Sequence, residues 1–349
     1  MDILKKVNFV RRKITKRLTK NIGRNTTNIT FNHYNTRNVK RVLIIRPNHT
    51  LGNLILLTPL LTEVSEIFPN CKIDLFVKGN LAPLLFKNYS NIDRIIQLPR
   101  KPFRNILQYL KVWSSIDERT YDVVINVDSD SSSGRIATKI AVADYKFYGE
   151  ADKMQFNESP HYAKQPVYGL RNYLSQSEKL NLTKSMHDLD LKLHPTEIKE
   201  GKAILDKLVK SKNTKTICLF TSATGDKCFP ESWWMELYKR LKREFADMNI
   251  IEVLPIDNIS KISFNEPTFY SNNIREIGAL IRNTSLFIGA DSGIMHLASS
   301  VKVPSIGLFS VTDRYKYEPY NEGSLAVNTN YCSTNEIIKI ITQRIDCKS

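Results

Sequence analysis

The chain has 349 residues, of which 42% are hydrophobic, 25% charged and 9% aromatic. This composition excludes disordered, collagen-like and disulfide-scaffold proteins. The chain is too long for a single hydrophobic core, so its length predicts two domains. The five scattered cysteines form no C-x-x-C pair, which argues against a structural zinc site and predicts a reducing, cytoplasmic compartment.

The net charge of +16 is concentrated at the N-terminus, where the first 24 residues hold nine Lys or Arg against Asp2 alone. Apolar residues recur there at steps of three or four, at Ile3, Val7, Val10, Ile14 and Leu18. A helix with this spacing has one apolar stripe on a basic surface, and anionic lipid attracts each basic residue by about 1 kcal/mol. We therefore predict that an arm over residues 1–38 binds the inner face of the cell membrane peripherally. A nucleic-acid arm and a solvated extension are the alternatives; the stripe favours lipid, so no nucleic-acid partner is expected.

The next part of the chain, residues 39–190, alternates strand and helix patterns. Short apolar runs predict strands at 42–45, 73–77, 95–98 and 123–127, and helical patterns occupy 54–68, 81–86 and 106–116. Alternation of this kind requires parallel pairing with crossover helices, so we predict a doubly wound sheet.

The same alternation of strand and helix patterns continues over residues 191–349. Strands are predicted at 216–220, 250–254, 286–289 and 305–309, and helices at 196–210, 233–245, 274–281, just after Gly293, and at 335–345. The sequence thus predicts two Rossmann-type α/β domains with a cleft between them. No stretch approaches the roughly 20 apolar residues that span a membrane.

Ligands of doubly wound sheets bind beyond the carboxyl ends of the strands, where three loops carry suitable residues. In the loop at 289–296, Asp291 and Ser292 are both good N-caps for the helix that follows Gly293. The N–H groups and dipole of that helix favour a phosphate, and His296 could donate to a diphosphate or a sugar hydroxyl. The alternative is an ordinary capped helix with a surface histidine.

Two further loops are candidates. The loop at 221–230 contains Ser222 and Lys227, which could contact a diphosphate, although it lacks the P-loop order and could be a plain polar connection. The loop at 46–53 contains Asn48, His49 and Gly52, and the glycine lets the backbone approach a ligand closely. Its alternative is a simple strand-to-helix turn.

Together, segments 51–60, 227–234 and 289–298 resemble glycosyltransferase family 9, the heptosyltransferase family of lipopolysaccharide core assembly. The resemblance implies a GT-B fold, with a nucleotide-diphosphate sugar held by the C-terminal domain and a lipopolysaccharide-type or lipid-linked acceptor held by the N-terminal domain. It implies inverting transfer without a metal or other cofactor, and it favours ADP-heptose as the co-substrate.

The resemblance also implies roles for single residues. Lys227 and Ser222 would contact the donor phosphates, and Asp257 would accept from the ribose. Around the diphosphate and sugar it places Asp291, Ser292, Gly293 and His296.

One position departs from the family pattern. The family has Gly-Asp where this chain has Gly52-Asn53, and an amide cannot act as the general base. Asp128, Asp130 and His49 are the nearest candidates, and we prefer Asp128 because it directly follows a predicted strand. The aspartates could instead cap the next helix. Asn53 also leaves open a catalytically inactive sugar-nucleotide-binding partner protein, and a GT-B-like sugar-nucleotide epimerase remains a further alternative.

Overall fold

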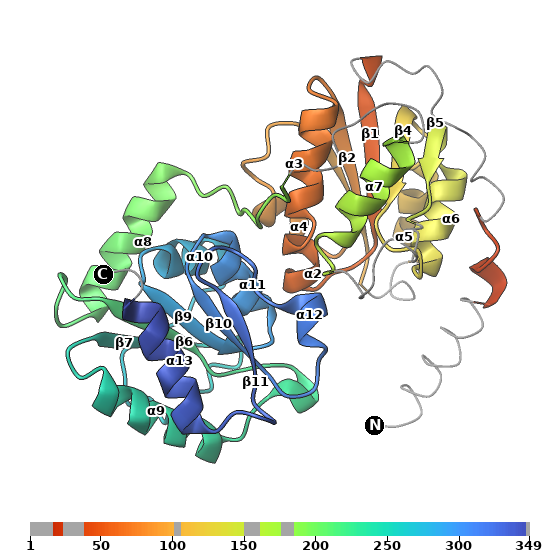
Figure 1. The fold of residues 1–349 in the computed structure, drawn as a ribbon. Coiled ribbons are helices and arrows are strands. Elements are labelled where there is room, and N and C mark those ends of the chain that lie inside the picture. Colours follow the sequence, from red (N-terminus) through yellow and green to blue (C-terminus); the bar gives the residue numbers. More distant parts are fainter. Residues whose placement is uncertain (1–16, 24–37, 101–105, 150–160, 176–184, 347–349) are drawn as a thin grey trace.

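The computed structural model describes residues 17–23, 38–100, 106–149, 161–175 and 185–346. It contains two α/β units, each built on one parallel sheet (Figure 1). Most of the predicted basic arm lies outside the described residues. Among the described residues, no helix combines the length and the apolar character needed to cross a membrane.

The first unit has five parallel strands in the order β3-β2-β1-β4-β5. The strands are β1 (Arg41–Arg46), β2 (Lys72–Lys78), β3 (Ile92–Leu98), β4 (Thr120–Asn126) and β5 (Val142–Phe147). The helices are α2 (Leu51–Ile55), α3 (Thr58–Ile67), α4 (Ala82–Leu85), α5 (Ile106–Ser114), α6 (Ser132–Ile140) and α7 (Gln165–Ser175). The central strand β1 is buried along nearly its whole length, which explains its continuous run of apolar residues.

The second unit has six parallel strands in the order β11-β10-β9-β6-β7-β8. The strands are β6 (Thr216–Phe220), β7 (Asn249–Val253), β8 (Thr268–Phe269), β9 (Leu286–Ala290), β10 (Ser305–Phe309) and β11 (Leu325–Asn328). The helices are α8 (Pro195–Leu208), the 3-10 turn η4 (Gly225–Lys227), α9 (Glu231–Glu244), α10 (Ile274–Arg282), α11 (Gly293–Ser300), α12 (Arg314–Tyr317) and α13 (Thr334–Asp346). Both sheets have the strand order of doubly wound nucleotide-binding folds, so the predicted fold class is confirmed.

The prediction of one helix over 54–68 is wrong. The chain forms α2 and α3 with a break at Leu56 and Leu57, because Pro59 lies in the first turn of α3 and has no N–H to continue a helix from α2. The hydroxyl of Thr58 donates to the carbonyl of Ile55 at 2.8 Å and so satisfies one acceptor at the break.

The sequence also did not reveal β5, β8, β11, α6, α7 and α12. The strands β5, β8 and β11 are short or lie at sheet edges, where one exposed side leaves no continuous apolar run to recognise. We place the boundary between the units at residue 190 as a proposal, since α7 packs on α3 of the first unit and α8 packs on α10 of the second.

Arg275 of α10 joins the two units and the segment that connects them. This buried side chain forms a double ion pair with Glu197, and it donates to the carbonyls of Leu85 in the first unit and Leu191 in the connecting segment. Charge-assisted hydrogen bonds of one guanidinium thus tie the two units and the connecting segment together.

Candidate active site at the facing ends of the two sheets

The strand order reverses beside the first strand of each sheet, between β1 and β4 in the first unit and between β6 and β9 in the second. Ligands of doubly wound folds bind at such switch points. Arg46 ends β1 and Asp128 follows β4, while Lys227 follows β6 and Asp291 follows β9. The chemically interesting residues therefore occupy the switch points of both sheets.

In the second unit, Lys227 and Asp291 form an ion pair. Lys227 Nζ lies 2.6 Å from Asp291 Oδ2, and the Asp291 side chain is almost fully buried. Ser292, and not Asp291, caps α11, because its hydroxyl accepts from the N–H of Met295 at 3.3 Å. Asp291 thus holds the lysine beside the helix N-terminus, where the N–H groups of Gly293 and Ile294 have no acceptor within the helix.

Tyr317 of α12 is a site residue that the sequence reasoning missed. Lys227 Nζ lies 5.6 Å from the centroid of its ring, and Tyr162 of the first unit stacks on the same ring with the two centroids 4.8 Å apart. The N–H of Tyr162 also donates to the carbonyl of Lys316 at 3.0 Å. Burial raises the pKa of Tyr317, so its phenol stays neutral. No motif marks this residue, since α12 was not predicted.

His296 is buried, so the alternative of a surface histidine is wrong. Its ring centroid lies 6.5 Å from that of Tyr317, and its Nδ1 has no hydrogen-bond partner in the described part of the chain. Burial lowers the pKa of His296 to about 4, opposed by Asp291 and assisted by Lys227. The imidazole is therefore neutral near pH 7, and its Nδ1 is a buried polar atom without a partner among the described residues.

Gly52 and Gly293 bring α2 of the first unit against α11 of the second. A Cβ on Gly293 would lie 2.9 Å from Leu51 Cβ, and one on Gly52 would lie 2.8 Å from His296 Cδ2. The close approach that Gly52 permits in this structure is therefore to another helix, where we had expected a ligand.

Arg46 organises the site in the first unit. This buried guanidinium donates to Asp128 Oδ2 at 2.9 Å and to Asn53 Oδ1 at 3.0 Å, and Asn53 Nδ2 donates to Thr50 Oγ1 at 2.7 Å. Asp128 also accepts from the N–H of Asp130 at 3.0 Å. The hydroxyl of Ser131 caps α6, so the alternative that an aspartate caps this helix is wrong.

Several predicted residues lie apart from these groups. His49 lies beside Arg100 and Lys78; burial and these two cations lower its pKa, and no contact in the described residues joins it to Asp128. The Asn48 side chain accepts from Thr50 within its own loop. Asp257 is exposed on a turn, and Ser222 is half-buried without a hydrogen bond in the described chain.

Glu252 of β7 is a second group that the sequence reasoning missed. Its carboxylate is fully buried and accepts from Thr221 Oγ1 at 2.6 Å and Ser260 Oγ at 2.5 Å. Burial raises the pKa of Glu252. Through Thr221 and Ser260, this buried acid ties the loop after β6 to the loop after β7, which also contains Asp257.

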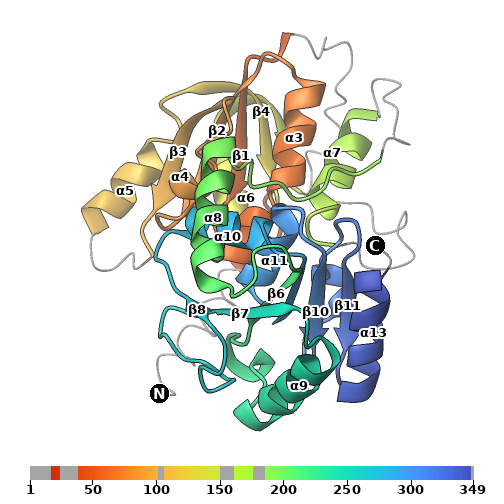
Figure 2. The same cartoon turned by 90° about the vertical axis from the view of Figure 1, so that its left-hand side faces the viewer.

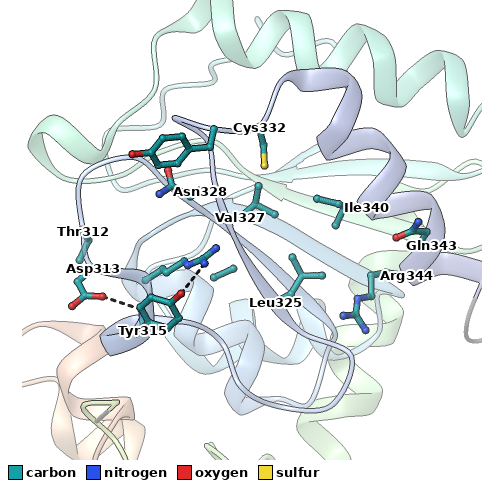
Figure 3. Close-up of a pocket in the computed structure, with 13 residues that line it drawn as sticks. Thr312, Asp313, Tyr315, Leu325, Val327, Asn328, Cys332, Ile340, Gln343 and Arg344 are labelled. Carbon is teal, nitrogen blue, oxygen red and sulfur yellow. Dashed lines mark hydrogen bonds between the residues drawn. The ribbon is translucent and has the colours of Figure 1, made fainter. Parts of the chain in front are cut away.

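A groove of about 840 Å³ lies elsewhere in the second unit, along β11 between α12 and α13 (Figure 3). Arg314 and Tyr315 line it, whereas Lys227, Asp291 and Tyr317 do not. The groove lies at the edge of the sheet, because β11 is an edge strand, and we assign the chemistry to the switch-point residues.

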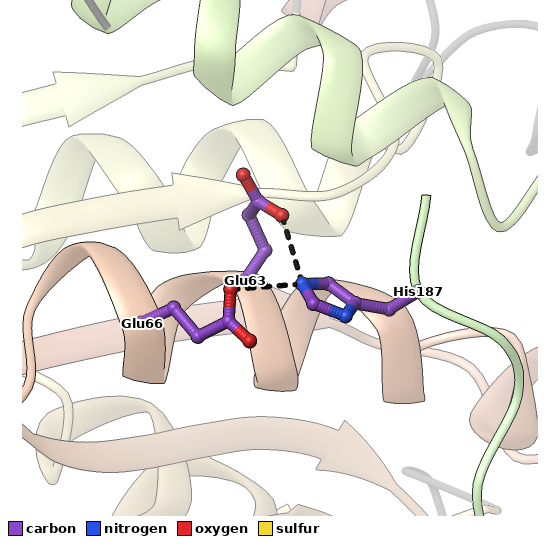
Figure 4. Close-up of side chains that lie close together, drawn as sticks. All are labelled: Glu63, Glu66 and His187. Carbon is purple, nitrogen blue, oxygen red and sulfur yellow. Dashed lines mark ion pairs between the residues drawn. The ribbon is translucent and has the colours of Figure 1, made fainter. Parts of the chain in front are cut away.

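One group of side chains in the described residues has metal-ligand chemistry: Glu63, Glu66 and His187 (Figure 4). His187 Nε2 lies 3.3 Å from Glu63 and 3.1 Å from Glu66. Arg171 already donates to both oxygens of Glu63, at 2.6 and 2.8 Å. A metal ion would have to displace this guanidinium, so the group fits a structural tie between α3 and the connecting segment.

Comparisons with known proteins agree with this geometry. Residues 271–340, which include the loop after β9, match the model of glycosyltransferase family 9 (heptosyltransferase). The chain is 26% identical over 290 residues to lipopolysaccharide heptosyltransferase 3 of Escherichia coli K12, covering 78% of this chain and 83% of that protein.

Two solved structures share the fold. A family 9 glycosyltransferase of Veillonella parvula has a TM-score of 0.69 at 17% identity, covering 89% of this chain and 98% of its own. Escherichia coli heptosyltransferase WaaC with ADP has a TM-score of 0.66 at 16% identity, covering 87% of this chain and 99% of its own. The family match at residues 271–340 and the relative, which aligns with most of the chain, make this chain similar to glycosyltransferase family 9 proteins of the heptosyltransferase type.

Proposed function

We propose that this chain transfers a heptose or related sugar, with inversion, from a nucleotide-diphosphate sugar to a lipopolysaccharide-type or lipid-linked acceptor. The Lys227–Asp291 pair at the start of α11 is the observation that carries the proposal. ADP-heptose is the favoured donor, because the relative is a lipopolysaccharide heptosyltransferase and a structure of the same fold was solved with ADP.

The second unit would bind the donor. A diphosphate at the start of α11 would accept hydrogen bonds from the N–H groups of Gly293 and Ile294 and from the Ser292 hydroxyl. It would also bind the ammonium of Lys227, which Asp291 holds in place. Neutral His296 would contact the sugar or a phosphate oxygen, and Ser222 and Asp257 would complete the site from the neighbouring loops. Fixed cationic groups and the helix dipole would neutralise the leaving group, so the reaction as proposed requires no metal.

The first unit would bind the acceptor at the loop that contains Asn48 and Gly52. Asp128 would act as the base, because position 53 has an amide while Arg46 holds both Asn53 and Asp128. Each Asp128 oxygen accepts one hydrogen bond already and has a lone pair left for an acceptor hydroxyl.

In the reaction, Asp128 takes the proton of the acceptor hydroxyl, and the hydroxyl oxygen attacks the anomeric carbon of the donor sugar. The bond from that carbon to the diphosphate oxygen breaks, and the nucleoside diphosphate leaves with the electron pair beside Lys227. Attack opposite to the leaving group inverts the anomeric centre. The basic arm would hold the enzyme at the anionic membrane face that presents the acceptor.

Calorimetric titration with ADP, GDP, UDP and CDP in a buffer with chelator tests the donor site. We expect selective binding that Lys227→Ala weakens by at least about tenfold, because a charge-assisted contact to phosphate is lost. Lys242→Ala is the matched control, since Lys242 lies on α9, away from the site, and forms an ion pair with Glu266. Absence of nucleotide binding would refute the proposal.

Asn53 favours one second candidate, an inactive protein that binds the sugar nucleotide. Incubation with ADP-heptose and a heptose-deficient lipopolysaccharide separates the two, with transfer measured by mass spectrometry of the acceptor. Nucleotide binding without transfer, in the wild type and in Asn53→Asp, would support the inactive protein. Incubation with donor alone would reveal an epimerase.

A further inference from the structure

We propose that α5 of the first unit docks on an anionic lipid bilayer through an exposed face formed by Ile106, Leu107 and Leu110. This docking face is distinct from the N-terminal arm. It extends the proposed function, because a lipid-linked acceptor lies at a bilayer, but binding of vesicles requires neither donor nor transfer.

The docking face is unusually apolar for a helix surface. The relative exposures of Ile106, Leu107 and Leu110 are 55%, 82% and 57%. Leu110 is four residues from Ile106 and three from Leu107, so the three side chains are neighbours on one side of the helix. Single exposed aliphatic residues are common, but contiguous ones mark an interaction site.

The opposite side of α5 fixes the helix to the sheet. Tyr109, Val112 and Trp113 pack against the core around Phe76, with the Phe76 and Trp113 rings 5.5 Å apart. These contacts already use the helix's large aromatic residues. Rotation of α5 to bury the docking face would therefore expose a better-packed side, so the face remains available to an external partner.

Charge around α5 favours an anionic bilayer. The sequence has no acidic residue between Leu98 and Asp117, and Lys111 lies in the last turn of the helix beside Leu110. Cations flanking aliphatic side chains suit lipid headgroups above acyl chains. Three aliphatic side chains on two turns also offer much less than the ~800 Å² per partner of a stable protein interface.

The position of α5 fits the proposed acceptor side. Arg100, between β3 and α5, lies against Gly79 and next to His49, which belongs to the loop after β1. Figure 2 shows α5 projecting at the outer edge of the first unit, on the side opposite α7. A bilayer at the docking face would therefore lie near the loop proposed to bind the acceptor.

The test is binding of the full-length protein to vesicles of phosphatidylglycerol and phosphatidylcholine, against phosphatidylcholine alone. The variant I106S/L107S/L110S is compared with the matched control I256S/I259S/V311S, which removes three aliphatic side chains that are 85%, 48% and 63% exposed on the second unit. We expect the first variant to lose about tenfold or more in partitioning to anionic vesicles, and the control to bind as the wild type does.

Two further measurements define the outcome. Equal melting temperatures of both variants show that folding is intact, and in L107W the new tryptophan should be quenched by brominated acyl chains while that of I256W is not. Unchanged vesicle binding of the α5 variant would overturn the proposal, even if the arm binds lipid. So would a wild-type dimer that the α5 variant dissociates without vesicles, since the face would then join two copies. ADP titration is a separate measurement, so failure of the donor site and failure of the docking face are distinguishable.

Discussion

Lys227 and Asp291 are 64 residues apart in the chain, yet Lys227 Nζ lies 2.6 Å from Asp291 Oδ2. The pairing exists because β6 and β9 are neighbours at the switch point of the second sheet. Asp291 is buried and Lys227 is partly exposed, so the lysine is the partner that a ligand can reach.

We expect Lys227→Met to lower the free energy of unfolding by about 1–2 kcal/mol, because it leaves the buried Asp291 carboxylate without its cation. Lys227→Met combined with Asp291→Asn should recover most of this loss. Urea denaturation of the two single variants and the double variant gives the coupling energy. Additive effects would show that the pair does not interact energetically.

We expect both removal of Arg46 and its replacement by lysine to impair the protein. Arg46→Met removes the donor of Asp128 and Asn53 together and should lower the free energy of unfolding by about 2–3 kcal/mol. Arg46→Lys keeps the charge but cannot bridge both groups, so kcat should fall about tenfold with nucleotide affinity unchanged. Arg240→Lys is the control, because Arg240 also bridges a carboxylate and an asparagine, but on α9. Equal kcat values for both lysine variants would contradict a positioning role of Arg46.

Tyr317 should contribute to nucleotide binding through its ring. Tyr317→Ala removes the surface against which Lys227 and Tyr162 lie, and we expect ADP affinity to fall about fivefold. Tyr317→Phe keeps the ring and should bind ADP as the wild type does. Tyr315→Ala changes an exposed tyrosine of the same short helix and serves as the control in calorimetric titration. A loss in Tyr317→Phe equal to that in Tyr317→Ala would assign the effect to the hydroxyl instead.

Gly293 and Gly225 should respond differently to alanine. Gly293→Ala places a methyl group 2.9 Å from Leu51 Cβ, which forces α11 away from α2 and should lower both the melting temperature and kcat. Gly225 has a φ of +62° with open space around its Cβ position, so Gly225→Ala should cost only about 1 kcal/mol of backbone strain. Calorimetric melting curves of both variants make the comparison. A smaller shift for Gly293→Ala than for Gly225→Ala would show that the helices adjust easily.

Burial of His296 predicts a dependence of stability on pH. Its pKa falls from 6.5 to about 4 on folding, so between these values the unfolded chain binds a proton that the folded chain does not. Stability should therefore decrease as the pH falls from 6.5 towards 4, with a slope of about 1.4 kcal/mol per pH unit from this residue. The slope for His296→Gln should be smaller by this amount when denaturation is measured from pH 4 to 7. Parallel profiles for the two proteins would contradict the assignment.

The sequence by itself determined the strands buried on both faces, the parallel class of the sheets and the loops that follow the strands. These features depend on local patterns, since an apolar run such as that of β1 has one suitable place, inside a covered sheet. The start of the helix capped by Ser292 could also be predicted, because an N-cap acts within a single helical turn.

Tertiary structure alone decided which loops meet. Strand order placed Arg46 beside Asp128 and Lys227 beside Asp291, and it left His49 and Asp257 apart from them. Contact between the two units made His296 a buried neutral histidine and brought Tyr162 onto Tyr317. Local propensity contains no information about such partners, because pairing between distant segments depends on the order of the strands and on the packing of one unit against the other.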